Sequence, residues 1–280
     1  MNDLFGLKGR TIVVAGAGGG GIGTAVCQAV ARVGAHVVGI DIDAGAMDES
    51  EKCVHDLGGQ FTRVIADVRD DDAAQAAARE ALAATGDLAG LVNIVGGVPV
   101  QSWSSLLGYD AQDFNEILHF NLSTTWQMSR AVAQVMIERG AGGSIVSLSS
   151  ISASGASPFH APYGAAKVAL RQLAQTMAVE WGPHGIRVNV VSPGTIETPR
   201  ATIPDDPERD RQGIPLGRRG RPAEIASAAL FLLSELSSYV TGQSIAVDGG
   251  ATTKHAYLDA DGFPIFMSAS ELRDKIRQQL

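Results

Sequence analysis

The feature that most constrains the fold is a regular alternation of short apolar runs with longer helical patterns. The apolar runs are rich in Val and Ile, are bounded by Gly, Asp or Ser, and are mostly apolar throughout. Such runs are typical of strands that are buried on both faces of a parallel sheet. They predict strands over residues 11–15, 36–40, 61–65, 90–95, 144–148, 187–191 and 244–247.

Helical patterns fill the intervals between these strands. They predict helices over residues 22–33, 71–85, 110–139, 163–181 and 222–233. Strands that alternate with helices favour a Rossmann-like, doubly wound α/β fold, with a seven-stranded parallel sheet and helices on both faces. No internal repeat or linker divides the chain before residue 250, so residues 1–250 are expected to form a single domain.

Residues 199–220 break this rhythm. The segment contains several prolines, arginines and acidic residues but no strand pattern. Long irregular insertions in compact domains are often functional, so the segment is interpreted as a substrate lid, with a solvated loop as the alternative. Its residues Arg200, Arg209 and Arg211 either recognise a substrate carboxylate or face solvent.

Residues 251–280 form a C-terminal extension. An apolar stretch surrounds the turn at Asp261 and Gly262, and the sequence Ser268-Ala269-Ser270-Glu271 matches a capping box that opens a helix. Two arrangements stay open for this extension. It either docks on its own subunit or crosses to the substrate pocket of a neighbouring subunit.

Composition and charge exclude several classes of protein. The 280 residues are 45% hydrophobic and 19% charged, and a net charge of −8 without a basic cluster argues against nucleic-acid binding. Cys27 and Cys53 provide neither a disulfide framework nor a zinc spacing, so no metal site is expected. The start of the chain does not resemble a signal peptide, and no apolar run approaches the ~20 residues that span a bilayer. A cytoplasmic protein without a membrane partner is expected.

A glycine-rich turn follows the first predicted strand and leads into the first predicted helix. The residues of this turn that are expected to contact a ligand are Gly16, Gly19, Gly21, Ile22 and Gly23. Without Cβ atoms in the way, backbone N–H groups and the helix dipole are able to approach a pyrophosphate. The turn therefore predicts a dinucleotide site, although glycines of this kind also permit tight packing alone.

Asp41 indicates which dinucleotide is bound. It follows the second strand eighteen residues after Gly23, close to the offset of the acidic residue that holds a ribose 2′-hydroxyl. A carboxylate at this place accepts hydrogen bonds from the ribose diol and repels a 2′-phosphate, and no Arg or Lys stands at Ile40, Ile42 or Asp43. NAD is predicted rather than NADP. The alternative is that Asp41 only forms the turn after its strand.

Tyr163 and Lys167 suggest the chemistry of the site. They are four residues apart, which places them on one face of a predicted helix. A free tyrosine has a pKa of ~10, which is too high for a general base at neutral pH. A neighbouring ammonium stabilises the phenolate and lowers that pKa.

Taken in order, these motifs resemble those of the short-chain dehydrogenase/reductase family over about residues 7–250. The motifs that carry the resemblance are the glycine turn, Asp67-Val68, Asn93-Ile94-Val95-Gly96, Asn121, Ser149-Ser150, Tyr163 with Lys167, Ser192-Pro193-Gly194-Thr195-Ile196-Glu197-Thr198, Thr241-Gly242-Gln243 and Asp248-Gly249-Gly250. The sequence departs from the family pattern in two segments. The glycine turn begins with Ala15 instead of Thr and is one residue longer than usual, and Ile94-Val95 replaces the usual Asn-Ala.

The resemblance implies a catalytic tetrad. Tyr163 is expected to be the general acid/base, with Lys167 lowering its pKa and holding the nicotinamide ribose. Ser150, with Ser149 as the alternative, is expected to bind the substrate oxygen, and Asn121 to hold a water in a proton relay. From the residues alone, it stays open that Ser150 only caps a turn and that Asn121 only bonds backbone within its helix.

The resemblance also implies where cofactor and substrate bind. Asp67 and Val68 are expected to contact adenine, and Ile196 and Thr198 the nicotinamide carboxamide. The other expected cofactor-binding residues are Ile42, Asn93, Val95, Gly96, Pro193 and Gly194. The expected substrate-binding residues are Gly97, Val98, Ser152, His160 and Thr195. Small residues among them favour a bulky or cyclic substrate, and a surface-facing His160 is the alternative for that residue.

The function implied is an NAD-dependent oxidoreductase that moves hydride between the nicotinamide and a secondary alcohol or ketone. Reduction of a 3-oxoacyl thioester is the alternative, because family members with that activity share these motifs, and a catalytically silent NAD-binding protein is a second. The family also implies a homotetramer with 222 symmetry. The helix expected at 110–139 has more apolar positions than one core-facing stripe requires. These positions are Leu118, Leu122, Met128, Val132, Val135 and Met136.

Overall fold

The computed structural model describes residues 3–199, 204–256, 258–265, 273–274 and 278. The seven strands of these residues form one sheet in the order β3-β2-β1-β4-β5-β6-β7, and every pair of neighbours is parallel. The strands are β1 (Thr11–Ala15), β2 (His36–Asp41), β3 (Phe61–Ile65), β4 (Gly90–Asn93), β5 (Gly143–Leu148), β6 (Ile186–Pro193) and β7 (Ser244–Val247). The fold is therefore the Rossmann-like, doubly wound α/β fold that the sequence predicts.

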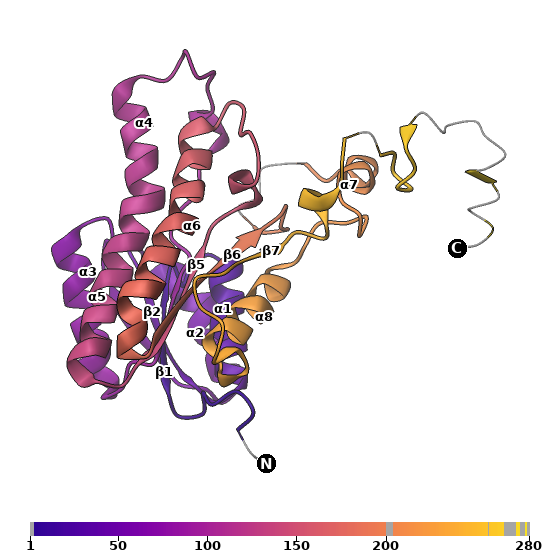
Figure 1. The fold of residues 1–280 in the computed structure, drawn as a ribbon. Coiled ribbons are helices and arrows are strands. Elements are labelled where there is room, and N and C mark those ends of the chain that lie inside the picture. The colour runs from indigo at the N-terminus through magenta and orange to yellow at the C-terminus, as the bar shows by residue number, and fades with distance from the viewer. Residues whose placement is uncertain (1–2, 200–203, 257, 266–272, 275–277, 279–280) are drawn as a thin grey trace.

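Helices cover both faces of this sheet (Figure 1). The helices are α1 (Ile22–Arg32), α2 (Asp48–Asp56), α3 (Asp71–Thr85), α4 (Ala111–Leu118), α5 (Thr124–Arg139), α6 (Ala161–Trp181), α7 (Pro207–Gly213) and α8 (Pro222–Leu233). Buried residues of α3, α5 and α6 pack on one face, and buried residues of α1, α2 and α8 pack on the other. The buried positions of β1, β2 and β4 are mostly apolar because both faces of these strands are covered, and Thr11 and Asn93 are the polar exceptions.

The helices differ from the prediction in three places, one of which is the short helix α7 in the segment 199–220. Helix α2 was not predicted. Its sequence is largely charged, and its buried residues, Ser50 and Val54, are too few to give an apolar helical pattern. The single helix expected at 110–139 is instead α4 and α5 joined by a π-helical turn, His119–Ser123. Single-turn π-helical segments of this kind are frequent at functional sites.

The segment 199–220 contains the short helix α7. A parallel bridge between Ile196 and Gly220 brings its two ends together, and a buried ion pair within it, between Arg219 Nε and Asp210 Oδ2, measures 2.8 Å. In the C-terminal extension, Leu258 pairs with Pro264 across the expected turn. The capping box expected at 268–271 lies outside the described residues. None of the described helices is long and apolar enough to cross a membrane.

Candidate active site

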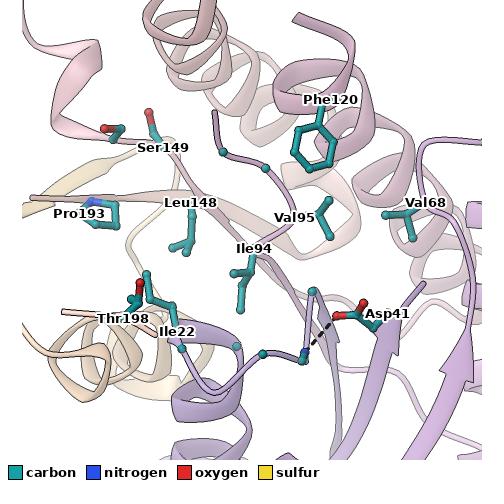
Figure 2. A pocket seen from close by; sticks show the side chains of 18 of the residues that line it. Ile22, Asp41, Val68, Ile94, Val95, Phe120, Leu148, Ser149, Pro193 and Thr198 are labelled. Carbon is teal, nitrogen blue, oxygen red and sulfur yellow. Dashed lines mark hydrogen bonds between the residues drawn. The ribbon is translucent and has the colours of Figure 1, made fainter. Parts of the chain in front are cut away.

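A cavity of about 640 Å³ lies at the carboxyl ends of β1, β2, β4, β5 and β6 (Figure 2). Its wall extends from the glycine turn and Asp41, past Val95, to Ser150 and Tyr163. Strand β1 pairs with β2 on one side and β4 on the other, so the order of the strands reverses there. The carboxyl edge of the sheet at such a switch point is where doubly wound folds bind ligands.

The glycine turn after β1 brings backbone segments into close contact. The N–H groups of Gly16 and Ala17 both donate to the Ile40 carbonyl oxygen, at 2.8 and 3.2 Å. A Cβ on Gly16 would lie 3.0 Å from the Val95 backbone nitrogen, and a Cβ on Gly23 would overlap the Gly16 carbonyl oxygen. Glycine is required at both positions because the neighbouring backbone fills the space of a side chain.

The first turn of α1 faces the cavity without a side-chain cap. Gly21 is the N-cap residue and has no side chain to accept from the helix, so the first N–H groups of α1 point outward as donors. The preceding loop is held from behind by a chain of hydrogen bonds. Gly20 N–H donates to Thr24 Oγ1, which lies 2.7 Å from Ser50 Oγ, and Ser50 Oγ donates to the Ala17 carbonyl oxygen at 2.6 Å.

Asp41 stands at the end of β2 with its carboxylate against the glycine turn. Its Oδ2 accepts from Gly18 N–H at 3.1 Å, as Figure 2 shows, and its Oδ1 accepts from Asp43 N–H at 3.2 Å. Each carboxylate oxygen has further lone pairs, so the group is able to accept from a bound diol as well.

Tyr163 and Ser150 come together at the far end of the cavity. Tyr163 lies in the first turn of α6, and Ser150 follows β5. Ser150 is hydrogen-bonded to Tyr163 and also accepts from Ser152 N–H at 3.1 Å, so it caps the turn after its strand as well. The alternative residue, Ser149, donates its hydroxyl to the Lys167 carbonyl oxygen at 2.8 Å and is 4% exposed.

Lys167 is buried one helical turn beyond Tyr163. The residue is 3% exposed, and its Nζ donates to the Leu148 carbonyl oxygen at 3.1 Å. A Cβ on Gly96 would lie 3.1 Å from this Nζ and 2.9 Å from Asn121 Oδ1. Glycine at this position, with a φ of +146°, therefore lets the segment after β4 pass between the ammonium and the amide.

The π-helical turn between α4 and α5 positions Asn121. Its Oδ1 accepts from Gly97 N–H at 2.7 Å, and its Nδ2 donates to the Gly97 and Ile117 carbonyl oxygens at 2.8 and 3.0 Å. The amide is completely buried, and part of its bonding is to its own helix, as the alternative interpretation of the sequence foresaw. Its main effect is to clamp the segment after β4 beside Lys167.

Burial controls the pKa of both groups of the Tyr163–Lys167 pair. It raises the pKa of Tyr163 above its ordinary value, and the hydrogen bond with Ser150 offsets this only in part. Burial lowers the pKa of Lys167 to about 8, because the charged ammonium is removed from contact with water. The Nζ lies 5.4 Å from the centre of the tyrosine ring. Burial therefore favours the neutral phenol of Tyr163 in this arrangement.

Most residues predicted to bind the cofactor line the cavity. They are Gly16, Gly19, Gly21, Ile22, Gly23, Asp41, Ile42, Asp67, Val68, Val95, Gly96, Tyr163, Lys167, Pro193, Gly194, Ile196 and Thr198. Asn93 was placed wrongly. It is 3% exposed, and its Nδ2 donates to Ser129 and Ser147 in the core, because the alternation of β4 directs it away from the cavity. Gly97 lines the cavity, whereas Val98, Ser152, His160 and Thr195 lie outside its wall.

The structure adds wall residues that were not among the expected cofactor-binding residues. These are Gly18, Ile40, Arg69, Ile94, Phe120, Leu148 and Ser149. Phe120 faces the cavity beside Val95 and Val68 (Figure 2), and its position next to Asn121 was the available signal. Arg69 donates to Asp67 at 2.6 to 3.0 Å, and these hydrogen bonds hold the pKa of Asp67 below its usual range. No sequence signal distinguished Arg69 from an ordinary surface arginine.

Comparisons with known proteins agree with this geometry. A family model described as enoyl-(acyl carrier protein) reductase matches residues 16–252. Galactitol 2-dehydrogenase (L-tagatose-forming) from Cereibacter sphaeroides is 38% identical over 256 residues, covering 89% of this chain and 97% of that protein. A short-chain type dehydrogenase/reductase from Mycobacterium marinum has a TM-score of 0.81 at 33% identity, covering 89% of this chain and 98% of that chain. The chain belongs to the short-chain dehydrogenase/reductase family.

Two further solved structures with similar folds contain different nicotinamide cofactors. A 7α-hydroxysteroid dehydrogenase complexed with NADH and 7-oxo glycochenodeoxycholic acid has a TM-score of 0.82 at 32% identity, covering 90% of this chain and 97% of that chain. A gluconate 5-dehydrogenase from Burkholderia cenocepacia J2315, in complex with NADP and tartrate, has the same TM-score and identity over 90% and 98%. The chain is therefore an oxidoreductase of a family that binds nicotinamide cofactors.

The residues present fit a dinucleotide. The Gly16–Gly23 contact leaves no side chain over the turn, and the uncapped start of α1 offers N–H donors to a phosphate. Asp41 and Asp67 supply acceptors toward one end of the cavity, and Tyr163 and Ser150 supply hydroxyls toward the other. Binding residues and reactive residues thus lie along one continuous wall.

Replacement of Lys167 by Met tests the burial of the ammonium. The folded-state pKa of about 8 lies below the ordinary 10.5, so at pH 7 the native protein carries a penalty of about 3 kcal/mol for keeping Lys167 charged. The parent regains this stability as the pH rises from 8 toward 10.5, because the folded lysine is then neutral while the unfolded one is still charged.

The stability of Lys167→Met relative to the parent should consequently fall between pH 7 and pH 9.5. Denaturant unfolding at the two pH values measures this difference, with Lys8→Met as the control because Lys8 is exposed. A difference that does not change with pH for Lys167→Met contradicts the shifted pKa.

Proposed function

We propose that the protein is an NAD-dependent dehydrogenase that interconverts a secondary alcohol and a ketone. The observation that carries the proposal is one cavity wall that holds Asp41 at the ribose end and Ser150, Tyr163 and Lys167 at the reactive end. Arg69 also lies in this wall, but its guanidinium is bonded to Asp67, which reduces its capacity to attract a 2′-phosphate. NAD is therefore favoured over NADP.

In this proposal the chain's own residues bind, orient and transfer a proton, and the nicotinamide supplies the hydride chemistry. The Ser150 hydroxyl holds the substrate oxygen next to Tyr163 Oη, to which it is already hydrogen-bonded. Tyr163 exchanges a proton with that oxygen. Lys167 stabilises the phenolate by charge, and Asn121 keeps the segment around Gly97 in place beside it.

Two other functions are distinguished by specific features. A 3-oxoacyl thioester reductase shares the family's motifs, and the matching family model is described by an acyl-carrier-protein substrate; NADP preference is expected there, and Asp41 opposes it. A silent NAD-binding protein would not need Ser150, Tyr163 and Lys167 on one cavity wall, with Asn121 next to Gly96 of that wall. Turnover of secondary alcohols with NAD⁺, rather than NADH binding alone, separates the proposed activity from both.

The first test concerns the proton. Tyr163→Phe keeps the ring but removes the hydroxyl, so kcat should fall by about 10²–10⁴-fold. NADH affinity, measured by fluorescence titration, should stay close to that of the parent. The control Tyr239→Phe, in which the side chain is fully exposed, should keep both the kcat and the NADH affinity of the parent. Retention of most of the turnover by Tyr163→Phe would remove this residue from the role.

The second test concerns cofactor choice. Asp41→Ser should relieve repulsion of a 2′-phosphate and weaken ribose binding, because a hydrogen bond to a charged group contributes roughly 1.5–3 kcal/mol. The ratio of kcat/KM with NAD⁺ to kcat/KM with NADP⁺ should fall by about tenfold or more.

Two further variants separate the charge from the shape of the turn. Asp41→Asn keeps an acceptor for Gly18 N–H and should also lower the ratio, whereas Asp43→Ser, which lies outside the cavity wall, should not. An unchanged ratio in both Asp41 variants would show that this carboxylate does not select the cofactor.

The proposal includes a homotetramer in the cytoplasm. The apolar positions of the helix expected at 110–139 support this assembly only in part, because Met128, Val132, Val135 and Met136 are buried in the core of their own subunit. The exposed apolar side chains that support subunit contacts are instead Trp126 on α5 and Val168 and Val179 on α6. Light scattering at micromolar concentration should give about four times the chain mass of 29.1 kDa. A monomeric mass would contradict the assembly.

A further inference from the structure

The arginines of the segment 204–220 are engaged with acidic residues of the same part of the chain. Each arginine of the segment 204–220 that the structure describes is already ion-paired: Arg209 and Arg219 with Asp210, Arg211 with Glu208, and Arg218 with Glu224. The hypothesis that Arg209 and Arg211 recognise a substrate carboxylate is therefore not supported. Neutral polar groups close to Tyr163 are therefore the candidates for recognition of the substrate.

His160 is the polar group that the fold holds beside Tyr163. Its ring stacks on Trp103 with centroids 4.6 Å apart and an angle of 25° between planes, and its centroid lies 5.9 Å from that of Tyr163. Trp103 comes from the segment after β4, whereas His160 and Tyr163 come from the start of α6. The imidazole thus lies between two aromatic rings, just beyond the wall formed by Ser150 and Tyr163.

A strained residue fixes this position. Among the described residues, Phe159 is the one non-glycine residue with a positive φ, at +67°, which is unfavourable for a bulky side chain. Its carbonyl oxygen accepts from Ser104 N–H at 2.9 Å and from Tyr109 Oη at 3.0 Å. Its side chain is 61% exposed, so the strain is not compensated by packing of the ring. Strain that the surroundings maintain in this way is characteristic of functional sites.

The hydrogen bonds of His160 determine what its ring offers to a ligand. Nδ1 lies 2.9 Å from the Pro158 carbonyl oxygen, which only accepts, so the neutral ring carries its proton on Nδ1. Nε2 is then an acceptor. Its nearest partner is Ser152 Oγ at the long distance of 3.4 Å, and Ser152 N–H in turn donates to Ser150 Oγ. A loosely bonded acceptor and a hydroxyl therefore stand next to the serine that would hold the reacting oxygen.

We propose that His160 Nε2 and Ser152 Oγ form a subsite for a second hydroxyl of the substrate, close to the carbon that reacts. Because Nε2 accepts, it selects a hydroxyl group over an ether, a carbonyl or an alkyl group at that position. The substrate class is a neutral vicinal diol or polyol, with its carbon chain against Trp103. This inference rests on the proposed dehydrogenase activity and specifies which alcohols that activity prefers.

The test compares matched alcohols that differ by one hydroxyl. The pairs are 2,3-butanediol with 2-butanol and 1,2-cyclohexanediol with cyclohexanol, each with NAD⁺. The parent should have a kcat/KM at least about tenfold higher for the diol of a pair. His160→Phe keeps an aromatic ring on Trp103 but removes the acceptor. It should lower kcat/KM for the diol by about tenfold and leave the mono-alcohol within about twofold.

Two controls protect the interpretation. His184→Phe changes an exposed histidine in the turn before β6 and should leave the ratio of diol to mono-alcohol unchanged. Ser152→Ala removes the second group of the subsite with little change of volume, and should lower the same ratio by about threefold even if His160→Phe does not fold.

The outcomes distinguish this inference from the proposed function. If the parent oxidises neither member of either pair, the dehydrogenase activity is contradicted and the subsite falls with it. If the parent oxidises the mono-alcohols but shows no preference for the diols, the subsite alone is contradicted. An equal loss on both alcohols in His160→Phe would likewise overturn it, because a residue that only supports Tyr163 affects every substrate in the same way.

Discussion

The site depends on how closely the backbone after β1 approaches its neighbours. The Ile40 carbonyl oxygen binds two successive N–H groups of the glycine turn, Gly23 is pressed against the Gly16 carbonyl, and Gly16 is pressed against Val95. These contacts join the ends of β1, β2 and β4 and direct the start of α1 toward the cavity. A side chain at either glycine would separate these strand ends, so the cavity wall follows from the turn.

The strands were predictable because burial on both faces leaves a continuous apolar signal. All seven begin within one residue of the expected position: five begin at it, and β5 and β6 begin one residue earlier, at Gly143 and Ile186, so burial alone locates the sheet. Helix α2 escaped prediction because its few buried residues give little periodicity. The π-helical turn escaped it because the apolar pattern continues through His119–Ser123 without a break, and its cause is the contact of Asn121 with Gly97, far away in sequence.

Site residues were predictable where a motif fixes both type and position. The glycine turn, Asp41 and the Tyr163–Lys167 pair are of this kind, and all of them line one cavity. Asn93 shows the limit, because its neighbours in the sequence line the cavity while its own side chain is directed into the core. His160 shows a second limit. Its position depends on Trp103 and on the conformation of Phe159, and neither is visible in the spacing of residues.

Asp41 combines two tasks. Its carboxylate accepts from Gly18 N–H at 3.1 Å, so the group that would receive the ribose also holds the glycine loop. The loop is additionally held from below by Thr24 and Ser50, whose hydroxyls lie 2.7 Å apart between α1 and α2. Because this second attachment does not involve Asp41, the loop keeps part of its support when the carboxylate is lost. A change at Asp41 is therefore expected to affect both cofactor choice and the position of the loop, because both involve its contact with Gly18. The loop does not depend on Asp41 alone, because Ser50 of the unpredicted helix α2 supports it separately.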